Sequence, residues 1–514
     1  MKMFRFHFAL LTIVLISIAT NVQAQDDERA LGAAADTIIR TETRDYIVNR
    51  IVEKVYQEHP TASLATRLAK AYYNYNEDGE TGIRNFHKND TVHAFLFIRR
   101  AIELDPKYAG AYVLASDILD YDRQEEAAMR WLDEGIKHNP KDSSLYLAQA
   151  KLLALKDEGA AVAKLEELRK MDPKFPVDLA LARMYYKIFD HGGTAEERFE
   201  CLKKLVEYYG KVDKEMMNLG DLGAYAMALQ FTNNFDECYE VSTYALRKNP
   251  DDIGLNGFLL SAAVRLKKWD ESIMAANKLM QIAPDKVTPV QYIQYGSALS
   301  GAKRYDEALK QFDHALNMES ATENNKGTAN NQINNTIVQM ASDHTKMGDY
   351  DKAFAIYDKY IAERKAAGKL DAYLIGMYAR AYIELAQEQN GAEKIPTLQK
   401  ACDIYGQMAE IFPDRQVFAL SSQFQIQSMM DPDSEQGLAK PYAEKLIPLI
   451  LAKEDWSADK PKLISAYHYL SYYNFIKSNY KEAVNYSDKV LALQPENPQA
   501  AKIKEIASKY AGRR

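Results

Sequence analysis

Apolar residues recur along this chain at three- and four-residue spacing, in stretches that short polar turns separate. In AKRYDEALKQFDHALNM, Phe312, Ala315 and Leu316 follow Ala308 on one face of a helix that opens at Ala308, after a turn that holds Tyr305. The stretch before this turn has the same one-sided spacing, at Tyr292, Tyr295, Gly296 and Leu299. The pattern therefore predicts two amphipathic helices joined by a turn.

A small residue recurs at equivalent places in this pattern, at intervals of 33 to 48 residues. It is found at Ala94, Ala128, Ala161, Ala195, Cys238, Ser272, Ala308, Ala353, Ala401, Ala439 and Ala483. Seven of these positions are followed twelve residues later by a proline, which ends a helix, at Pro106, Pro140, Pro173, Pro250, Pro284, Pro413 and Pro495. Periods of 33 and 34 residues are typical of stacked helical hairpins. A small residue at the crossing lets two helix axes approach to about 8 to 10 Å.

The final unit resembles the tetratricopeptide repeat position by position. It has the bulky, small, aromatic and proline residues of that family at Tyr467, Leu470, Ser471, Tyr480, Ala483, Val490 and Pro495. It departs from the family at Asn474 and Ser487, where aromatic residues are usual. The resemblance covers roughly residues 60 to 495. It implies an all-α, right-handed superhelical solenoid of about eleven helix-turn-helix units, each covering the apolar face of its neighbour.

Caps and one insertion complete the predicted organisation, because an open array would expose an apolar face at each end. The predicted order is an N-terminal segment (25–60) with a capping helix at Thr43–Gln57, repeats (61–319), an Asn-rich loop (320–336), repeats (337–495) and a C-terminal capping helix (496–514). The capping helix at Thr43–Gln57 would place Tyr46, Ile47, Ile51 and Val55 on its inner side. We expect no helix in the loop, which either divides the solenoid into two segments or is a flexible excursion.

The first 24 residues have the pattern of a secretory signal peptide. Lys2 and Arg5 precede an apolar run over residues 8–19, and small residues at Val22 and Ala24 predict cleavage before Gln25. A membrane anchor is the alternative, although a run of twelve residues is short of the ~20 that span a bilayer. We therefore expect an exported protein, in the periplasm or alternatively at the cell surface or outside the cell.

Charge and cysteine content exclude some functions. The formal net charge is −7 and no basic patch stands out, so nucleic acid is not an expected partner. The three cysteines, Cys201, Cys238 and Cys402, have no metal-binding spacing. Cys238 occupies a small-residue position and is predicted to be a buried thiol, with a disulfide to Cys201 as the open alternative.

Catalytic and metal-binding patterns are weak. Ser300 with Lys303, and Ser478 with Lys481, match the S-x-x-K pattern of acylating serine enzymes, but both matches fall in predicted turns and lack the companion motifs. A polar insertion contains His87, Asp90 and His93, a ligand set that zinc could use, although a solvated loop is the simpler interpretation. We therefore predict neither an enzyme nor a bound cofactor or metal.

The resemblance implies that the first helix of each unit lines a concave groove. Relatives that grip a C-terminal carboxylate place lysine there, whereas this chain has Val113, Tyr146, Ala180, Gly223, Gly257, Ile293 and Val338 at the corresponding positions. Instead, four residues predict an apolar strip suited to a peptide partner, namely Tyr146, Met184, Met227 and Phe231. The alternative is that these side chains pack between neighbouring helices.

The predicted function is therefore that of an exported, non-enzymatic scaffold that binds another protein through this groove. A glycan- or small-ligand-binding component of the cell envelope is the alternative. For that role the sequence offers one tryptophan outside the helical pattern, Trp456 in the loop KEDWSADKPK.

Overall fold

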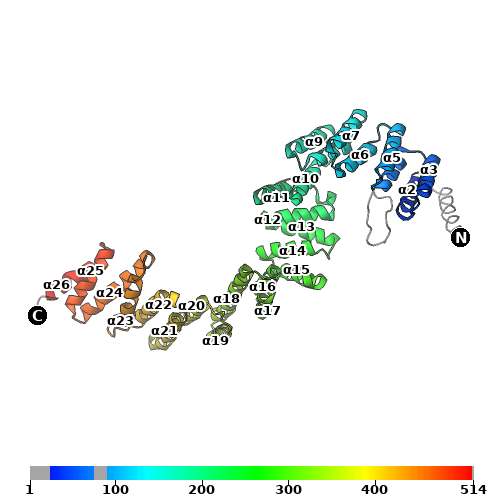
Figure 1. Cartoon of the computed structure of the whole chain (residues 1–514). Coiled ribbons are helices and arrows are strands. Elements are labelled where there is room, and N and C mark those ends of the chain that lie inside the picture. Colours follow the sequence, from blue (N-terminus) through cyan, green and yellow to red (C-terminus); the bar gives the residue numbers. More distant parts are fainter. Residues whose placement is uncertain (1–23, 74–88, 512–514) are drawn as a thin grey trace. The chain divides into compact units, whose positions relative to one another are not determined.

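The computed structural model describes residues 24–73 and 89–511, with side chains from Arg29 onward. These residues form 25 α-helices and five short 3-10 helices, without a β-strand, so the predicted all-α fold is confirmed (Figure 1). The predicted signal peptide lies outside the described residues, except for Ala24, which begins the first helix.

The helices lie in the order α2 (Ala24–Thr41), α3 (Asp45–Glu58), α4 (Ala62–Tyr73), α5 (Thr91–Leu104), α6 (Ala109–Tyr121), α7 (Glu125–His138), α8 (Ser143–Leu153), α9 (Glu158–Met171), α10 (Val177–His191), α11 (Ala195–Tyr209), α12 (Leu219–Phe231), α13 (Phe235–Lys248), α14 (Ile253–Arg265), α15 (Trp269–Ile282), α16 (Pro289–Gly301), α17 (Tyr305–Asn317), α18 (Glu323–Lys346), α19 (Tyr350–Ala366), α20 (Ala372–Glu388), α21 (Lys394–Ile411), α22 (Gln416–Met430), α23 (Lys440–Leu451), α24 (Lys460–Ile476), α25 (Tyr480–Leu493) and α26 (Pro498–Ala511). The 3-10 helices are Lys214–Met216, Pro284–Lys286, Gly391–Glu393, Pro413–Arg415 and Ser457–Asp459.

Helices α4 to α25 form eleven consecutive pairs, the number that the small residues predict. First helices of successive pairs also pack on one another, as α4 does on α6, α6 on α8, α16 on α18 and α18 on α20. This stacking makes the chain a solenoid of tetratricopeptide-like hairpins. The chain divides into two compact units, Met1–Phe258 and Leu259–Arg514, so the division falls inside α14 rather than at the predicted 320–336.

Six pairs share one three-residue turn. Its middle residue has a positive φ, at Arg123, Asn233, Lys267, Lys303, Gly348 and Ser478. The next residue donates its backbone N–H to the carbonyl five residues before it, as Arg304 does to Leu299 at 2.8 Å. This is a Schellman ending, which satisfies the last carbonyls of the first helix while the chain reverses. The turns therefore repeat in geometry although their sequences differ.

The helix crossings are formed by the predicted small residues. In eight pairs the small residue is the fourth residue of the second helix and has no exposed surface, at Ala94, Ala128, Ala161, Cys238, Ser272, Ala308, Ala353 and Ala483. Ala308 is thus inside α17, which opens at Tyr305 and includes the predicted turn residue. The close approach is also visible at Gly296 of α16, where an added Cβ would lie 2.5 Å from Cε1 of Phe312.

The prediction for Ala195 was wrong, because this residue is exposed at the start of α11. Gly192 and Gly193 have φ values of 121° and 113°, which exclude a helix there. Thr194 then caps the helix in a capping box with Glu197, so α11 begins later than the repeat spacing implies. Cys201, 7% exposed, is the small buried residue of this helix.

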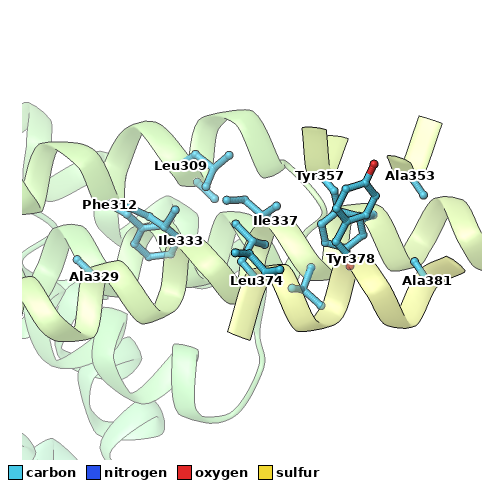
Figure 2. Packing of buried hydrophobic residues seen from close by; sticks show 14 of the residues in the cluster. Leu309, Phe312, Ala329, Ile333, Ile337, Ala353, Tyr357, Leu374, Tyr378 and Ala381 are labelled. Atoms are coloured by element: carbon cyan, nitrogen blue, oxygen red, sulfur yellow. The ribbon is translucent and has the colours of Figure 1, made fainter. Parts of the chain in front are cut away.

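The prediction of a loop at 320–336 was also wrong. Thr322 caps α18 in a capping box with Asn325, and the helix then runs through the Asn-rich stretch. Ala329, Ile333 and Ile337 are buried at helical spacing against neighbouring helices, as Figure 2 shows beside Phe312, Leu309 and Leu374. The polar composition obscures this apolar stripe, because it includes six asparagines, of which Asn324, Asn331 and Asn335 are exposed.

The two ends of the array carry extra helices. The N-terminal segment contains two helices rather than the one predicted, and α3 buries Val48, Val52 and Val55, whereas Tyr46 is 70% exposed. Of the predicted inner face, Val55 is buried and Ile47 and Ile51 are half-buried, so the prediction was wrong for Tyr46. At the other end, α26 follows the last pair and buries Ala500, Ile503 and Ala507.

Candidate functional site

The four predicted groove residues lie on three successive first helices, α8, α10 and α12, but their environments differ. Tyr146 is buried, and its hydroxyl donates to the carbonyl of Pro140 at 3.0 Å. Met184 is 6% exposed, Met227 is half-buried and Phe231 is 59% exposed. Tyr146 therefore has the packing role that the sequence left as the alternative, whereas Phe231 presents its ring to solvent.

Tyr146 was assigned to the wrong position in its repeat. Tyr112 and Asn256 make the same bond as Tyr146, each to the carbonyl of the proline six residues before it, at 3.0 Å. The residue equivalent to Val113 and Gly257 is therefore Leu147. The interval from Ala128 to Ala161 is one residue shorter than the interval from Ala94 to Ala128. Counting back from Ala161 by the spacing of the other repeats therefore reaches Tyr146, whereas counting forward from Pro140 reaches Leu147.

A cavity of about 290 Å³, partly open to solvent, lies where α8, α9 and α10 meet. It is lined by Leu147, Ala150, Lys151, Ala154, Leu165, Phe175, Pro176, Leu179, Ala180, Arg183, Met184 and Lys187. Nine of these twelve residues are apolar. Of the predicted strip, only Met184 belongs to it. Ala180 was also placed in the groove by its repeat position, and sequence reasoning missed the other ten.

The three charged residues around this cavity are all basic, although the chain as a whole is acidic. The Lys151 ammonium lies 3.4 Å from a carboxylate oxygen of Asp117, and both side chains are exposed. The Lys187 ammonium donates to the carbonyl of Lys151 at 3.2 Å. Such exposed contacts leave the lysines most of their charge and hydrogen-bonding capacity.

Arg183 connects the cavity to α12. Its Nε and Nη2 donate to the two carboxylate oxygens of Asp221 at 2.8 and 2.7 Å. Asp221 is 5% exposed, and it also accepts from the backbone N–H of Asn218 at 3.0 Å and from the hydroxyl of Tyr209 at 3.3 Å. Burial alone would raise the pKa of Asp221, but the hydrogen bonds from Arg183 and Asn218 outweigh it and hold that pKa below its ordinary value.

The weak catalytic patterns have structural roles. Lys303 is the positive-φ residue of its turn, and its ammonium pairs with Asp343 at 2.8 Å. The Ser300 hydroxyl is buried and accepts from the hydroxyl of Thr336 at 3.0 Å. Ser478 is the positive-φ residue of the last turn. The two S-x-x-K matches therefore belong to the Schellman turns and the packing around them.

The remaining candidates for chemistry are the histidine set of the polar insertion and the three cysteines. His93 contacts Asp90 at 2.8 Å, while His87 lies outside the described residues. Within residues 24–73 and 89–511, no cluster of three or more His, Cys, Asp or Glu side chains has the arrangement of a metal site. The three cysteines are free and buried, and burial raises the pKa of the Cys238 thiol to about 11. None of the helices in these ranges combines the length and apolar character needed to cross a bilayer.

The tryptophans bear on the glycan alternative. Trp131 packs beside Phe95 and Tyr112, and Trp269 fills the space over Gly301, where a Cβ would lie 2.5 Å from the indole. Trp456 is half-buried against the C-terminal apolar cluster. All three indoles are therefore used in packing.

Comparison with known proteins gives structural neighbours only. No protein-family model matches the sequence, and no curated protein matches it. Among solved structures, the C-terminal part of a TPR repeat-containing protein from Cytophaga hutchinsonii is 21% identical, covers 55% of this chain and 98% of its own, and has a TM-score of 0.35. The Cut9–Hcn1 hetero-tetramer of APC/C is 14% identical over 97% of this chain and 98% of its own, with a TM-score of 0.29. At such distances the fold assignment rests on the hairpins, turns and crossings of this chain.

Proposed function

We propose that this chain is an exported, non-enzymatic scaffold that binds a polypeptide partner through the first helices α8, α10 and α12. The observation that supports this most directly is the cavity at Met184, which has an apolar floor and lies partly open to solvent. On α12, Met227 is half-buried and Phe231 is 59% exposed. An aromatic side chain and methionines on adjacent helices suit contact with another polypeptide. The signal-peptide pattern of residues 1–24 supports export, with the periplasm as the proposed compartment.

Photo-crosslinking tests the binding surface. A benzophenone amino acid replaces Phe231 on α12, and the matched control replaces Phe199, a 45% exposed phenylalanine on the second helix α11. We expect a discrete polypeptide adduct from position 231 that position 199 does not give. Identical adducts from both positions, or none from 231, would contradict a partner on the first helices.

N-terminal sequencing of the chain recovered from the exported fraction tests the compartment. We expect the mature protein to begin at Gln25. A chain that keeps its first 24 residues, or that stays in the cytoplasm, would overturn the proposed export.

A further inference from the structure

The cavity of α8, α9 and α10 has a size suited to one or two large side chains. A dry apolar cavity of about 150 Å³ holds a benzene molecule. The cavity here has about 290 Å³, and its apolar lining includes Leu147, Leu165, Phe175, Leu179 and Met184. An apolar side chain that enters the cavity would lose its contact with water on every side except at the mouth. Such desolvation in a pocket is typical of a binding hot spot.

The basic residues around the cavity favour particular neighbours of that apolar residue in the bound segment. Arg183 and Lys187 are four residues apart on α10, so they lie one helical turn apart on the same side, and Lys151 reaches the cavity from α8. Arg183 uses Nε and Nη2 for Asp221, which leaves the hydrogens on Nη1, and Lys187 uses one donor for the carbonyl of Lys151. Separate donors of this kind match carboxylates spaced along a segment rather than one terminal carboxylate.

From this charge complementarity we propose that the cavity binds an internal segment of a polypeptide partner in which a large apolar residue is flanked by aspartate or glutamate. The apolar side chain occupies the cavity, and the flanking carboxylates accept hydrogen bonds from Lys151, Lys187 and the Nη1 group of Arg183. This inference rests on the proposed function, which it deepens by naming the chemistry of the partner.

Three labelled, C-terminally amidated peptides of equal length in a Gly/Ser background test the pairing. One has a central leucine flanked by glutamates, one has the same leucine flanked by lysines, and one has a central serine flanked by glutamates. We expect the full chain to bind the first peptide at least about tenfold more tightly than either of the others in fluorescence anisotropy, and less tightly as salt is raised. Equal binding of all three peptides would overturn the proposal. It would also fail if the acidic leucine peptide bound only in a fourth version that has a free C-terminal carboxylate.

Variants of the chain localise the contact. Ala180→Phe places a ring in the cavity from its half-buried wall, and we expect it to weaken binding of the acidic leucine peptide by about tenfold or more. Lys187→Gln keeps a donor for the carbonyl of Lys151 but removes the charge, and we expect a loss of about threefold. Lys445→Gln, at an exposed lysine on α23, is the matched control and leaves the affinity unchanged. If circular dichroism shows that the Ala180 variant does not fold, the peptide affinity of the Lys187 variant tests the proposal.

The same variants separate this inference from the proposed function. If the position-231 adduct persists in Ala180→Phe and Lys187→Gln, and these variants bind the peptide as the wild type does, the scaffold function stands and the assignment of the cavity is wrong. If neither adduct nor peptide binding is found with the wild type, the proposed function itself fails. Displacement of the acidic leucine peptide by dodecanoate, with no preference among the three peptides, would identify the cavity as a site for small amphiphiles.

Discussion

Gly296 tests how tightly the helices of a hairpin approach. This glycine lies within α16, and a Cβ built on it would lie 2.5, 2.7 and 2.8 Å from Cε1, Cδ1 and Cζ of Phe312 on α17. Phe312 has no exposed surface, so its ring has no solvent space into which to move. Gly296→Ala should therefore force the two helices of the pair apart.

The magnitude follows from two opposing terms. Replacing a helical glycine by alanine stabilises a helix by up to about 1 kcal/mol, because alanine loses less backbone entropy on folding. Overpacking of a well-filled core costs about 1 to 3 kcal/mol. Gly327 on α18 is the matched control, because an added Cβ there meets nothing within 4 Å and Gly327→Ala gains only the first term. The difference between the two variants should therefore be about 1 to 3 kcal/mol, with Gly296→Ala the less stable.

Thermal unfolding of the full chain, followed by circular dichroism, measures the difference. About 1 kcal/mol corresponds to roughly 2 to 4 °C for 150 to 250 residues, so Gly296→Ala should melt at least about 2 °C below Gly327→Ala. Because the chain has two compact units, hydrogen exchange of the α16 and α17 amides assigns the change to this pair. Equal melting temperatures and equal exchange would refute the close crossing.

Three further predictions follow from the structure. Ala308→Leu should destabilise the chain by about 1 to 3 kcal/mol through overpacking, whereas Ala195→Leu, at an exposed position, should change the melting temperature little. Thr322→Ala should cost about 1 kcal/mol and increase hydrogen exchange in the first turn of α18, and unchanged exchange would contradict the capping box. Asp221→Asn should cost about 1 to 2 kcal/mol at neutral pH, because it removes charge-assisted bonds from the half-exposed Arg183. Folding lowers the pKa of Asp221, so the stability that its carboxylate contributes is complete above pH 3.8, its ordinary pKa, and is lost as the pH falls through the pKa of the folded state. The melting curves of the wild type and the variant should therefore converge in acid.

The candidate site was only partly predictable. Helical spacing placed Met184, Met227 and Phe231 on first helices, which the structure confirms, whereas their role in binding stays a prediction. Leu147 was missed because one repeat is a residue shorter than its neighbour, which shifted the alignment to Tyr146. Alignment on Pro140 instead identifies Leu147. The basic residues around the cavity were missed for another reason. Lys151 and Lys187 lie 36 residues apart, and only the folded array brings the Lys187 ammonium to the carbonyl of Lys151.

The sequence by itself determined that this chain is an all-α array of about eleven hairpins, because the signals for a hairpin are local. An amphipathic stripe, a small residue at the crossing and a proline after the second helix all act within one repeat. Only the tertiary structure decided that residues 323–336 are helical and which residues enclose the cavity at Met184. These features depend on contacts between neighbouring repeats, where burial against the next helix outweighs the preference of the local sequence.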